Sequence, residues 1–463
     1  MNESEMFGSK LRSSFAVVGH PNKGKSSIVS TLARNDSIDI SRQSGTTKTS
    51  NRYRIDTGNG GFELIDTPGF QRPRQVLKWL KAKANSADQY TDAIKAFVMD
   101  ESCQQNFPDE VELLSPLVKG AAILYVVDGS RPYGAEYEAE MEILRWTGRP
   151  SMALINPIES DEYVVPWQNA LNQFFKMVRV FNPMNADLQE QVSLLNTFAL
   201  LEPKWKNNLE LVISDLIEQE NNLMLQSVRI LADLLVECCS YQFQQKVLTK
   251  GQAESTQGFL KIQFNNHLIN EEKNAHQALL ELFAYHKILI DKEDLKVGPD
   301  LFDTEQWYLW GLSKKQLAIT GTITGVATGA VADMALAGSS FLLGAVGGGI
   351  LGFTSAFFGS DYIGKMKLKG LPLGGYLAQQ GPITDLNFPY VIIGRFSYLY
   401  EQLKNKNHAD RRDVDLNTVE LSAKIKMLKK EEAKQLHKAC SLLVKQKVAS
   451  DLKGALEILF SSI

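Results

Sequence analysis

Cysteine is scarce in this sequence. Four of the 463 residues are cysteines, none of them forms a C-x-x-C pair, and no group of Cys and His has the spacing of a zinc site. These absences argue against a disulfide scaffold and predict a reduced, cytoplasmic compartment. The first apolar run, residues 15–18, is also too short for the hydrophobic region of a signal peptide.

A strong excess of charge of one sign is lacking as well. The 50 Lys and Arg residues face 53 Asp and Glu residues, so the formal net charge of −3 creates no global field that would attract nucleic acid. The charge is unevenly placed, because from residue 361 onward 17 basic residues stand against 11 acidic ones. Apolar residues make up 44% of the chain, the share of a folded globular protein, and the length predicts about two to four domains.

The first 190 residues alternate between short apolar strands and helical stretches. Helical periodicity is found, for example, at residues 26–33 and 137–146. This alternation predicts an α/β domain over residues 1–190, in which helices cover both faces of a mostly parallel sheet. The predicted strands are residues 15–19, 52–56, 62–66, 122–128, 151–156 and 177–181.

A phosphate-binding motif lies between the first predicted strand and the first predicted helix. Residues 19–26 read GHPNKGKS and fit the pattern G-x-x-x-x-G-K-[ST]. Its glycines let backbone N–H groups surround a β-phosphate, Lys25 would reach the β- and γ-phosphates, and the Ser26 hydroxyl would bind Mg²⁺. The other residues predicted to contact nucleotide here are Gly19, Pro21, Asn22, Lys23, Gly24 and Ser27.

Two further motifs complete the predicted phosphate and magnesium site. Residues 66–69 read DTPG at the end of another apolar strand, where Asp66 is predicted to hold Mg²⁺ through water and Gly69 to donate its N–H to a γ-phosphate. Residues 45–48 read GTTK, and Thr47 is the predicted magnesium ligand, with Thr46 as the alternative. The predicted catalytic residues are Lys25, Thr47 and Gly69.

Together these motifs resemble those of the Era/TrmE group of translation-factor-related GTPases. The resemblance implies a P-loop GTPase fold, GTP and GDP as the bound nucleotides, and Mg²⁺ as cofactor. In some members of the group, the P-loop asparagine helps to bind a potassium ion that takes the place of an arginine finger. Asn22 occupies that position, so the resemblance implies potassium as a second candidate cofactor.

Two positions depart from the pattern of the family. Phe70 follows Gly69 where Ras-like proteins have a water-orienting glutamine, which predicts slow intrinsic hydrolysis, on the order of 10⁻⁴ s⁻¹. The base-reading motif, normally Asn/Thr-Lys-x-Asp, reads NPIE at residues 156–159. Asn156 and Glu159 are predicted to read guanine although Pro157 replaces the lysine, and adenine or relaxed specificity is the alternative.

The stretch between the DTPG motif and Gly120 is longer than an ordinary connection. Helical periodicity at residues 75–83 and 93–99 predicts a helical insertion over residues 71–119. Two interpretations stay open: an effector segment that moves with the nucleotide state, or a static insertion.

After residue 190 the sequence becomes mainly helical. Residues 191–316 are predicted to form a helical domain, with helices at 209–246 and 274–290. Residues 361–463 are predicted to form a basic helical region with a long helix near 419–448. Its lysine clusters could face anionic lipid or nucleic acid, or form an ordinary solvated helix face.

Residues 317–359 form a Gly/Ala/Thr-rich apolar block with a single charge, Asp333. Two trios of its glycines, 321/325/329 and 344/348/352, are spaced four residues apart, which is the small-xxx-small pattern of closely packed helices. They predict a glycine-zipper hairpin over residues 317–360 with helices at 317–337 and 341–359. Each helix has about the ~20 residues of a membrane span, and lysines flank the pair on both sides. Membrane insertion and a hairpin buried in a soluble core are the two alternatives.

The overall layout resembles a less characterised bacterial group, in which an Era-like GTPase domain precedes a helical C-terminal region of unknown function with a Gly/Ala-rich apolar segment. The sequence thus predicts a slow GTPase that acts as a switch at the cytoplasmic face of the inner membrane, anchored by residues 317–359, with an unidentified protein effector. A dynamin-like membrane-remodelling GTPase and an RNA- or ribosome-associated assembly factor are the alternatives.

Overall fold

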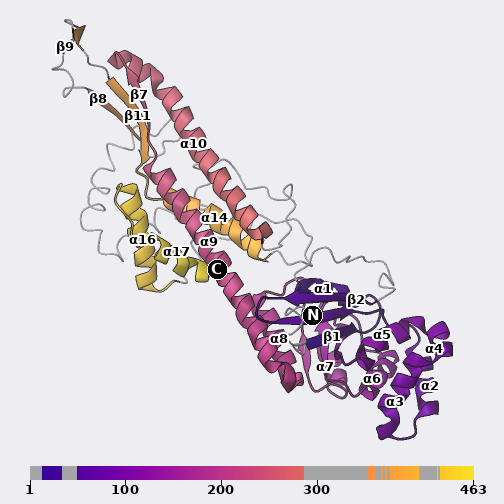
Figure 1. Ribbon diagram of the computed structural model, residues 1–463. Coiled ribbons are helices and arrows are strands. Elements are labelled where there is room, and N and C mark those ends of the chain that lie inside the picture. Colours follow the sequence, from indigo (N-terminus) through magenta and orange to yellow (C-terminus); the bar gives the residue numbers. More distant parts are fainter. Residues whose placement is uncertain are drawn as a thin grey trace, which may run out of the picture. The chain divides into compact units, whose positions relative to one another are not determined.

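The protein contains two compact units (Figure 1). One contains residues 1–220 and 405–412, and the other contains residues 221–404 and 413–463. The computed structural model describes residues 13–33, 50–285, 353–359, 367–368, 371–372, 376–405, 425 and 428–462.

A six-stranded sheet forms the centre of the first unit, with strand order β2-β3-β1-β4-β5-β6. Strand β2 is antiparallel to β3, and the other neighbours are parallel. The predicted α/β domain with a mostly parallel sheet is therefore confirmed. The strands are β1 (Ser13–Val18), β2 (Asn51–Asp56), β3 (Gly61–Asp66), β4 (Ala122–Asp128), β5 (Ser151–Asn156) and β6 (Val178–Val180).

Alternating side chains of β1 enter two cores on opposite faces of this sheet. Phe15 and Val17 pack in one core with residues of α1 (Lys25–Ala33) and α8 (Leu188–Leu201). Ala16 and Val18 pack in the other, which includes residues of α6 (Glu136–Trp146) and α7 (Val164–Leu171). Every residue of β4 is buried, as expected for a central parallel strand that is covered on both faces.

Helices fill the long segment that follows the DTPG motif. Val76, Leu80, Phe97 and Leu113 are buried in the same core as β1 and β4, and the Trp79 and Phe97 rings meet edge-to-face at 5.3 Å. The insertion is therefore part of the domain core. Its elements are α2 (Pro73–Lys83), the short 3₁₀ helix η2 (Ala87–Gln89), α3 (Tyr90–Met99), α4 (Glu101–Asn106) and α5 (Pro108–Val118).

The second unit is mainly helical, as predicted, but it also contains a three-stranded antiparallel sheet with the order β7-β11-β8. A buried ion pair joins α10 to α14, in which Arg395 Nε and Nη2 lie 2.5 and 3.0 Å from the two carboxylate oxygens of Glu272. Helix α9 (Lys206–Ser240) begins in the first unit and continues into the second, because the boundary follows residue 220. The other elements are β7 (Phe243–Val247), α10 (Lys250–Tyr285), β8 (Phe353–Gly359), β9 (Lys367–Leu368), β10 (Leu371–Pro372), β11 (Tyr376–Ile383), α14 (Phe388–Asn405), α16 (Lys430–Val444) and α17 (Leu452–Ser461).

Two helix predictions are wrong at their ends. The helix predicted over 209–246 ends at Ser240, and residues 243–247 form β7, which pairs with β11. The second helix of the predicted glycine zipper cannot reach residue 359, because residues 353–359 form β8. This segment is rich in phenylalanine, which favours strand, and its partner β11 lies outside the apolar block.

The rest of the apolar block, residues 317–352, lies outside the described residues. Within the parts of the chain that the structure does describe, no helix is both long enough and apolar enough to cross a membrane.

The remaining helix predictions differ from the structure in extent. The helix predicted at 274–290 begins much earlier, since α10 starts at Lys250. In the C-terminal region α16 covers the second half of the stretch predicted at 419–448, and residues 419–424 fall outside the described parts.

Candidate nucleotide-binding site

The site lies at the edge of the sheet where the parallel strands end. Strand β1 ends at Val18, and residues 19–24 then lead directly into α1 at Lys25. In the pairing of β1 with β3, Val17 lies opposite Asp66, so the ends of the two strands and the loops that follow them are neighbours. Parallel α/β sheets bind ligands at this edge.

The turn of the phosphate-binding loop requires glycine at position 24. Gly24 has φ +81°, in the left-handed region, and a Cβ atom there would lie 2.2 Å from Asn156 Nδ2. Asn22, which is exposed, also lies in the left-handed region at φ +61°. The loop therefore wraps tightly, as a cradle for phosphate oxygens does.

Lys25 is folded back across this loop. Its Nζ donates to the backbone oxygens of His20 at 2.9 Å and Gly19 at 3.3 Å. Burial lowers the pKa of Lys25 to about 8, and the nearby Asp66 carboxylate partly offsets that effect. Lys25 therefore places a positive charge beside the loop, where it can attract anionic phosphate groups.

Ser26 and Asp66, which are 40 positions apart in the sequence, meet at the edge of the sheet. The Ser26 hydroxyl donates to Asp66 Oδ2 at 2.7 Å, and Asp66 is buried. A hydroxyl and a carboxylate are hard oxygen donors of the kind that Mg²⁺ prefers beside nucleotide phosphates, so these residues fit the predicted magnesium site. The third predicted ligand, Thr47, and its alternative Thr46 lie outside the described residues.

The DTPG motif packs against the phosphate-binding loop. The Phe70 N–H donates to the Gly19 carbonyl oxygen at 3.2 Å, and the Thr67 hydroxyl donates to the Val17 carbonyl oxygen at 2.7 Å. A Cβ atom on Gly69 would lie 2.6 Å from the backbone nitrogen of Pro21, so this close approach requires glycine. The predicted γ-phosphate contact of Gly69 is thus directly beside the loop.

The end of β5 also contacts the phosphate-binding loop. Asn156 is buried, and its Nδ2 donates to the Lys23 carbonyl oxygen at 3.3 Å. Lys23 Nζ lies 3.5 Å from Asp128 Oδ2, and Asp128 is the β4 neighbour of Asn156. Glu159 is placed differently: its side chain is 67% exposed and lies 3.2 Å from Arg131.

His20 of the phosphate-binding loop contacts a buried pair, Glu140 and Tyr125, that was not predicted from the sequence. His20 Nδ1 lies 2.8 Å from Glu140 Oε1, and the Tyr125 hydroxyl donates to Glu140 Oε2 at 2.9 Å. Burial raises the pKa values of both Glu140 and Tyr125. No local motif marks these contacts, because His20 and Glu140 are 120 positions apart in the sequence.

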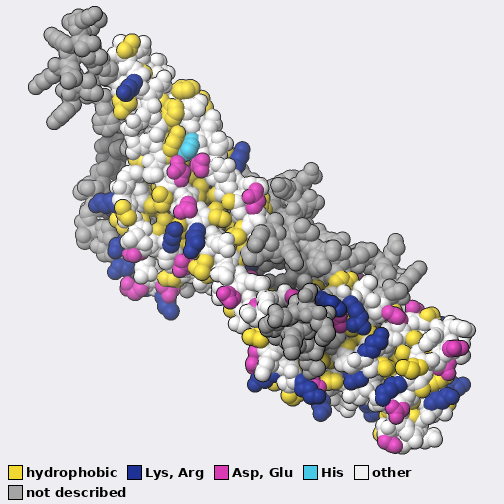
Figure 2. All heavy atoms as spheres, in the orientation of Figure 1, with side chains coloured by type: hydrophobic (Ala, Val, Ile, Leu, Met, Phe, Trp, Pro, Cys, Tyr) yellow, Lys and Arg dark blue, Asp and Glu magenta, His cyan; other side chains and the backbone are white. Residues whose placement is uncertain are grey.

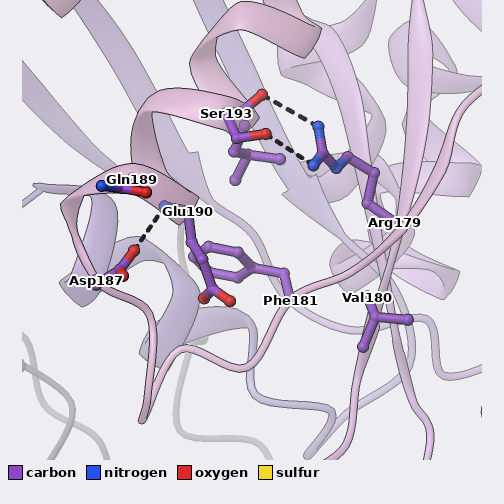
Figure 3. A pocket seen from close by; sticks show the side chains of 8 residues that line it. Arg179, Val180, Phe181, Asp187, Gln189, Glu190 and Ser193 are labelled. Carbon is purple, nitrogen blue, oxygen red and sulfur yellow. Dashed lines mark hydrogen bonds between the residues drawn. The ribbon is translucent and has the colours of Figure 1, made fainter. Parts of the chain in front are cut away.

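A cavity of about 250 Å³ lies elsewhere in the first unit, between β6 and the start of α8 (Figure 3). Arg179 points toward α8 and donates to the Ser193 carbonyl oxygen at 3.1 Å and to its hydroxyl at 2.8 Å. Asp187 accepts from the Glu190 N–H at 2.7 Å and caps the helix. The residues predicted to contact nucleotide are not among those that line this cavity, so it is separate from the nucleotide site.

The buried lysine makes nucleotide binding sensitive to alkaline pH. Lys25 has a pKa of about 8 in the free protein, and bound phosphate would stabilise its charged form. Binding is therefore expected to be strongest below pH 8 and to weaken as the pH rises through 8, by up to about tenfold per pH unit. Equilibrium titration with a fluorescent nucleotide from about pH 7 to about pH 9.5 measures this change. An affinity that is constant over this range would contradict the role of Lys25, and the exposed-site control Lys81→Ala should keep the wild-type profile.

Comparison with known proteins finds similar sequences for both parts of the chain. Residues 14–156 match a family described as 50S ribosome-binding GTPase. The tRNA modification GTPase MnmE of Flavobacterium psychrophilum is 30% identical over 87 residues, which are 19% of this chain and 19% of that protein. GTPase Der of Clostridium botulinum is 40% identical over 65 residues, which are 14% of this chain and 15% of that protein. The chain thus covers less than a fifth of the length of these curated relatives.

Among solved structures, one of Era in complex with MgGDPNP and a segment of 16S ribosomal RNA is similar with a TM-score of 0.27 and 14% identity, over 52% of this chain and 74% of that chain. Residues 168–456 match the family described as a domain of unknown function, DUF3482. Since that match spans more than half of the chain, the protein belongs to the DUF3482 family, and a P-loop GTPase domain precedes the matched region.

Proposed function

We propose that this protein binds GTP and hydrolyses it slowly in the presence of Mg²⁺, and that it acts as a molecular switch. The observation that carries the proposal is the contact between Ser26 and Asp66 beside the buried Lys25. In this arrangement the loop N–H groups and Lys25 hold the phosphates, and Ser26 with Asp66 hold the metal ion. Bound Mg²⁺ would offset the negative charge on the phosphate oxygens.

The surroundings of Phe70 support a low intrinsic rate. Phe70 has no hydrogen-bonding side-chain atom and is fully buried in the domain core, so it cannot orient a water molecule. Gln71 is exposed and its N–H is bound to Glu110. Without a residue that positions the attacking water, a rate on the order of 10⁻⁴ s⁻¹ is expected, as in unassisted small GTPases. Potassium at the exposed Asn22, or a protein partner, would raise this rate.

The β5 end of the site supports guanine as the base. A guanine presents two N–H donors to one carboxylate, and we assign that role to Glu159. The ion pair of Glu159 with Arg131 is exposed and therefore weak, so a base can displace it. Lys23, held beside Asp128, places a cation near Asn156 although Pro157 stands where the family has lysine. Equal affinity for GTP and ATP would favour the alternative of relaxed specificity.

We further propose that the protein is attached to the cytoplasmic face of the bacterial inner membrane through residues 317–352. This segment contains one charge, Asp333, and glycines at intervals of four residues. It leads directly into β8, which is fixed in the sheet of the second unit by β11.

The basic C-terminal region gives less support to a nucleic-acid partner than the apolar segment gives to membrane attachment. On the face seen in Figure 2, basic and acidic side chains are interspersed. In α16 and at its start, Lys429 lies 3.7 Å from Glu432 and Lys434 lies 4.0 Å from Glu431, which reduces the field available to phosphate groups.

Substitutions in the phosphate-binding loop test the nucleotide site. Lys25→Ala and Ser26→Ala are expected to abolish GTP binding, because they remove the phosphate cation and the metal ligand. Isothermal titration with GTP and Mg²⁺, in potassium and in sodium buffer, measures the loss. The control variant Lys81→Ala removes an exposed lysine of α2 and should bind as the wild type does. Normal GTP affinity in Lys25→Ala would show that the site is elsewhere.

Replacement of residues 317–352 by a Gly/Ser linker tests membrane attachment while it leaves β8 intact. The variant is expected to move from the membrane fraction to the soluble fraction, since the apolar segment supplies the anchor. Fractionation of cells that express either chain measures this, and GTP binding by the variant shows that its first unit is folded. Recovery of the wild-type chain in the soluble fraction would refute the membrane proposal. Copurification with ribosomal particles that is lost at high salt would favour an RNA-associated role instead.

A further inference from the structure

Helix α5 begins next to two segments beside the predicted magnesium site: the residues that follow the DTPG motif and the residue that precedes β2. We propose that α5 is a positioning element that holds both segments through Glu110 and Glu112 and thereby sets how strongly the site distinguishes GTP from GDP. The inference rests on the proposed function, since it concerns the γ-phosphate side of the same site.

Glu110 holds the segment that follows the DTPG motif. Its Oε1 accepts from the N–H groups of Gln71 at 3.0 Å and Arg72 at 2.5 Å. Glu110 is fully buried, and its Oε2 has no hydrogen-bond partner among the described residues. A buried carboxylate of this kind depends on the few donors that it has, so movement of residues 71 and 72 away from α5 would be costly.

Glu112 holds the segment that follows the GTTK motif. Its Oε1 accepts from the Ser50 N–H at 2.9 Å, and the Ser50 hydroxyl donates to the Glu112 carbonyl oxygen at 3.3 Å. Ser50 immediately precedes β2, and in the pairing of β2 with β3 Asn51 lies opposite Asp66. The start of β2 and the end of β3 are therefore adjacent at the magnesium site.

The geometry of a helix explains how one element reaches both segments. Residues two positions apart project roughly 200° apart around a helix axis, so Glu110 and Glu112 face different sides of the first turns of α5. Arg72 gives a further contact, since its guanidinium lies 5.2 Å from the centre of the Phe107 ring just before α5.

The other end of α5 is fixed in the domain. Leu113 and Leu117 are fully buried in the core of the sheet. Arg149, just before β5, donates from Nε to the Leu117 carbonyl oxygen at 2.7 Å and from Nη2 to the Val118 carbonyl oxygen at 3.1 Å. A helix anchored in this way cannot follow the two segments freely, so it restrains them.

This arrangement has a consequence for nucleotide recognition. Gly69, the predicted γ-phosphate contact, lies two residues before the Gln71 N–H that Glu110 holds. If Glu110 is removed, Gly69 is held less firmly, and the interaction with the γ-phosphate weakens. GDP lacks that phosphate, so its affinity should not depend on Glu110.

The test compares GTP and GDP affinity in Glu110→Ala, measured by titration of the full-length protein with Mg²⁺. The affinity for GTP is expected to fall about tenfold, the effect of losing hydrogen bonds to a charged group, while that for GDP stays within about twofold. Glu110→Gln, which keeps an acceptor oxygen, should stay close to the wild type. The control Glu101→Ala removes an exposed carboxylate from the neighbouring helix α4 and should change neither affinity.

Several outcomes would overturn the proposal. An unchanged ratio of GTP to GDP affinity in Glu110→Ala would do so, and so would an equal loss of both affinities, which would indicate a merely structural role. If Glu110→Ala does not fold, Glu112→Ala carries the test, and an unchanged ratio there would exclude the two-sided restraint. Failure of the proposed function is distinct, because the wild-type protein would then bind neither nucleotide.

Discussion

The parallel pairing of β1 with β3 is the constraint on which the site depends. It places Val17 opposite Asp66, so the loop that follows β1 and the motif that ends β3 meet at one edge of the sheet. The hydrogen bond from Ser26 to Asp66 results from this register. A shift of one residue would turn Asp66 to the other face and separate the hydroxyl from the carboxylate.

The insertion after the DTPG motif packs against the same strands and contacts the segments beside them. Its helices share a core with β1 and β4, and α5 bonds to the backbone on both sides of the β2–β3 hairpin through Glu110 and Glu112. The sequence left two interpretations open, a moving effector segment and a static insertion. The structure has features of both, since α5 is packed in the core and also contacts the segments on both sides of the β2–β3 hairpin. A fixed helix can report or resist movement at the phosphate site because its contacts are made to the segments that would move.

The sequence was informative where structure is local. Most strands of the first unit are short apolar runs, and the phosphate-binding loop is a contiguous motif, so both could be predicted from the sequence. The roles of Glu110 and Glu140 could not, because each contacts residues far away in the sequence and neither lies in a motif. Strand β8 was missed for a related reason: the four-residue spacing of the glycines before it is typical of packed helices, whereas the pairing of β8 with β11 is long-range.

Titration of the full-length chain with GTP, GDP and ATP, first with Mg²⁺ and then with a chelator, tests the central claim most directly. The Ser26 and Asp66 contact predicts one saturable site that prefers guanine nucleotides, with GTP binding that weakens strongly when Mg²⁺ is removed. Binding of GTP that does not depend on Mg²⁺, or no binding of any nucleotide, would contradict it.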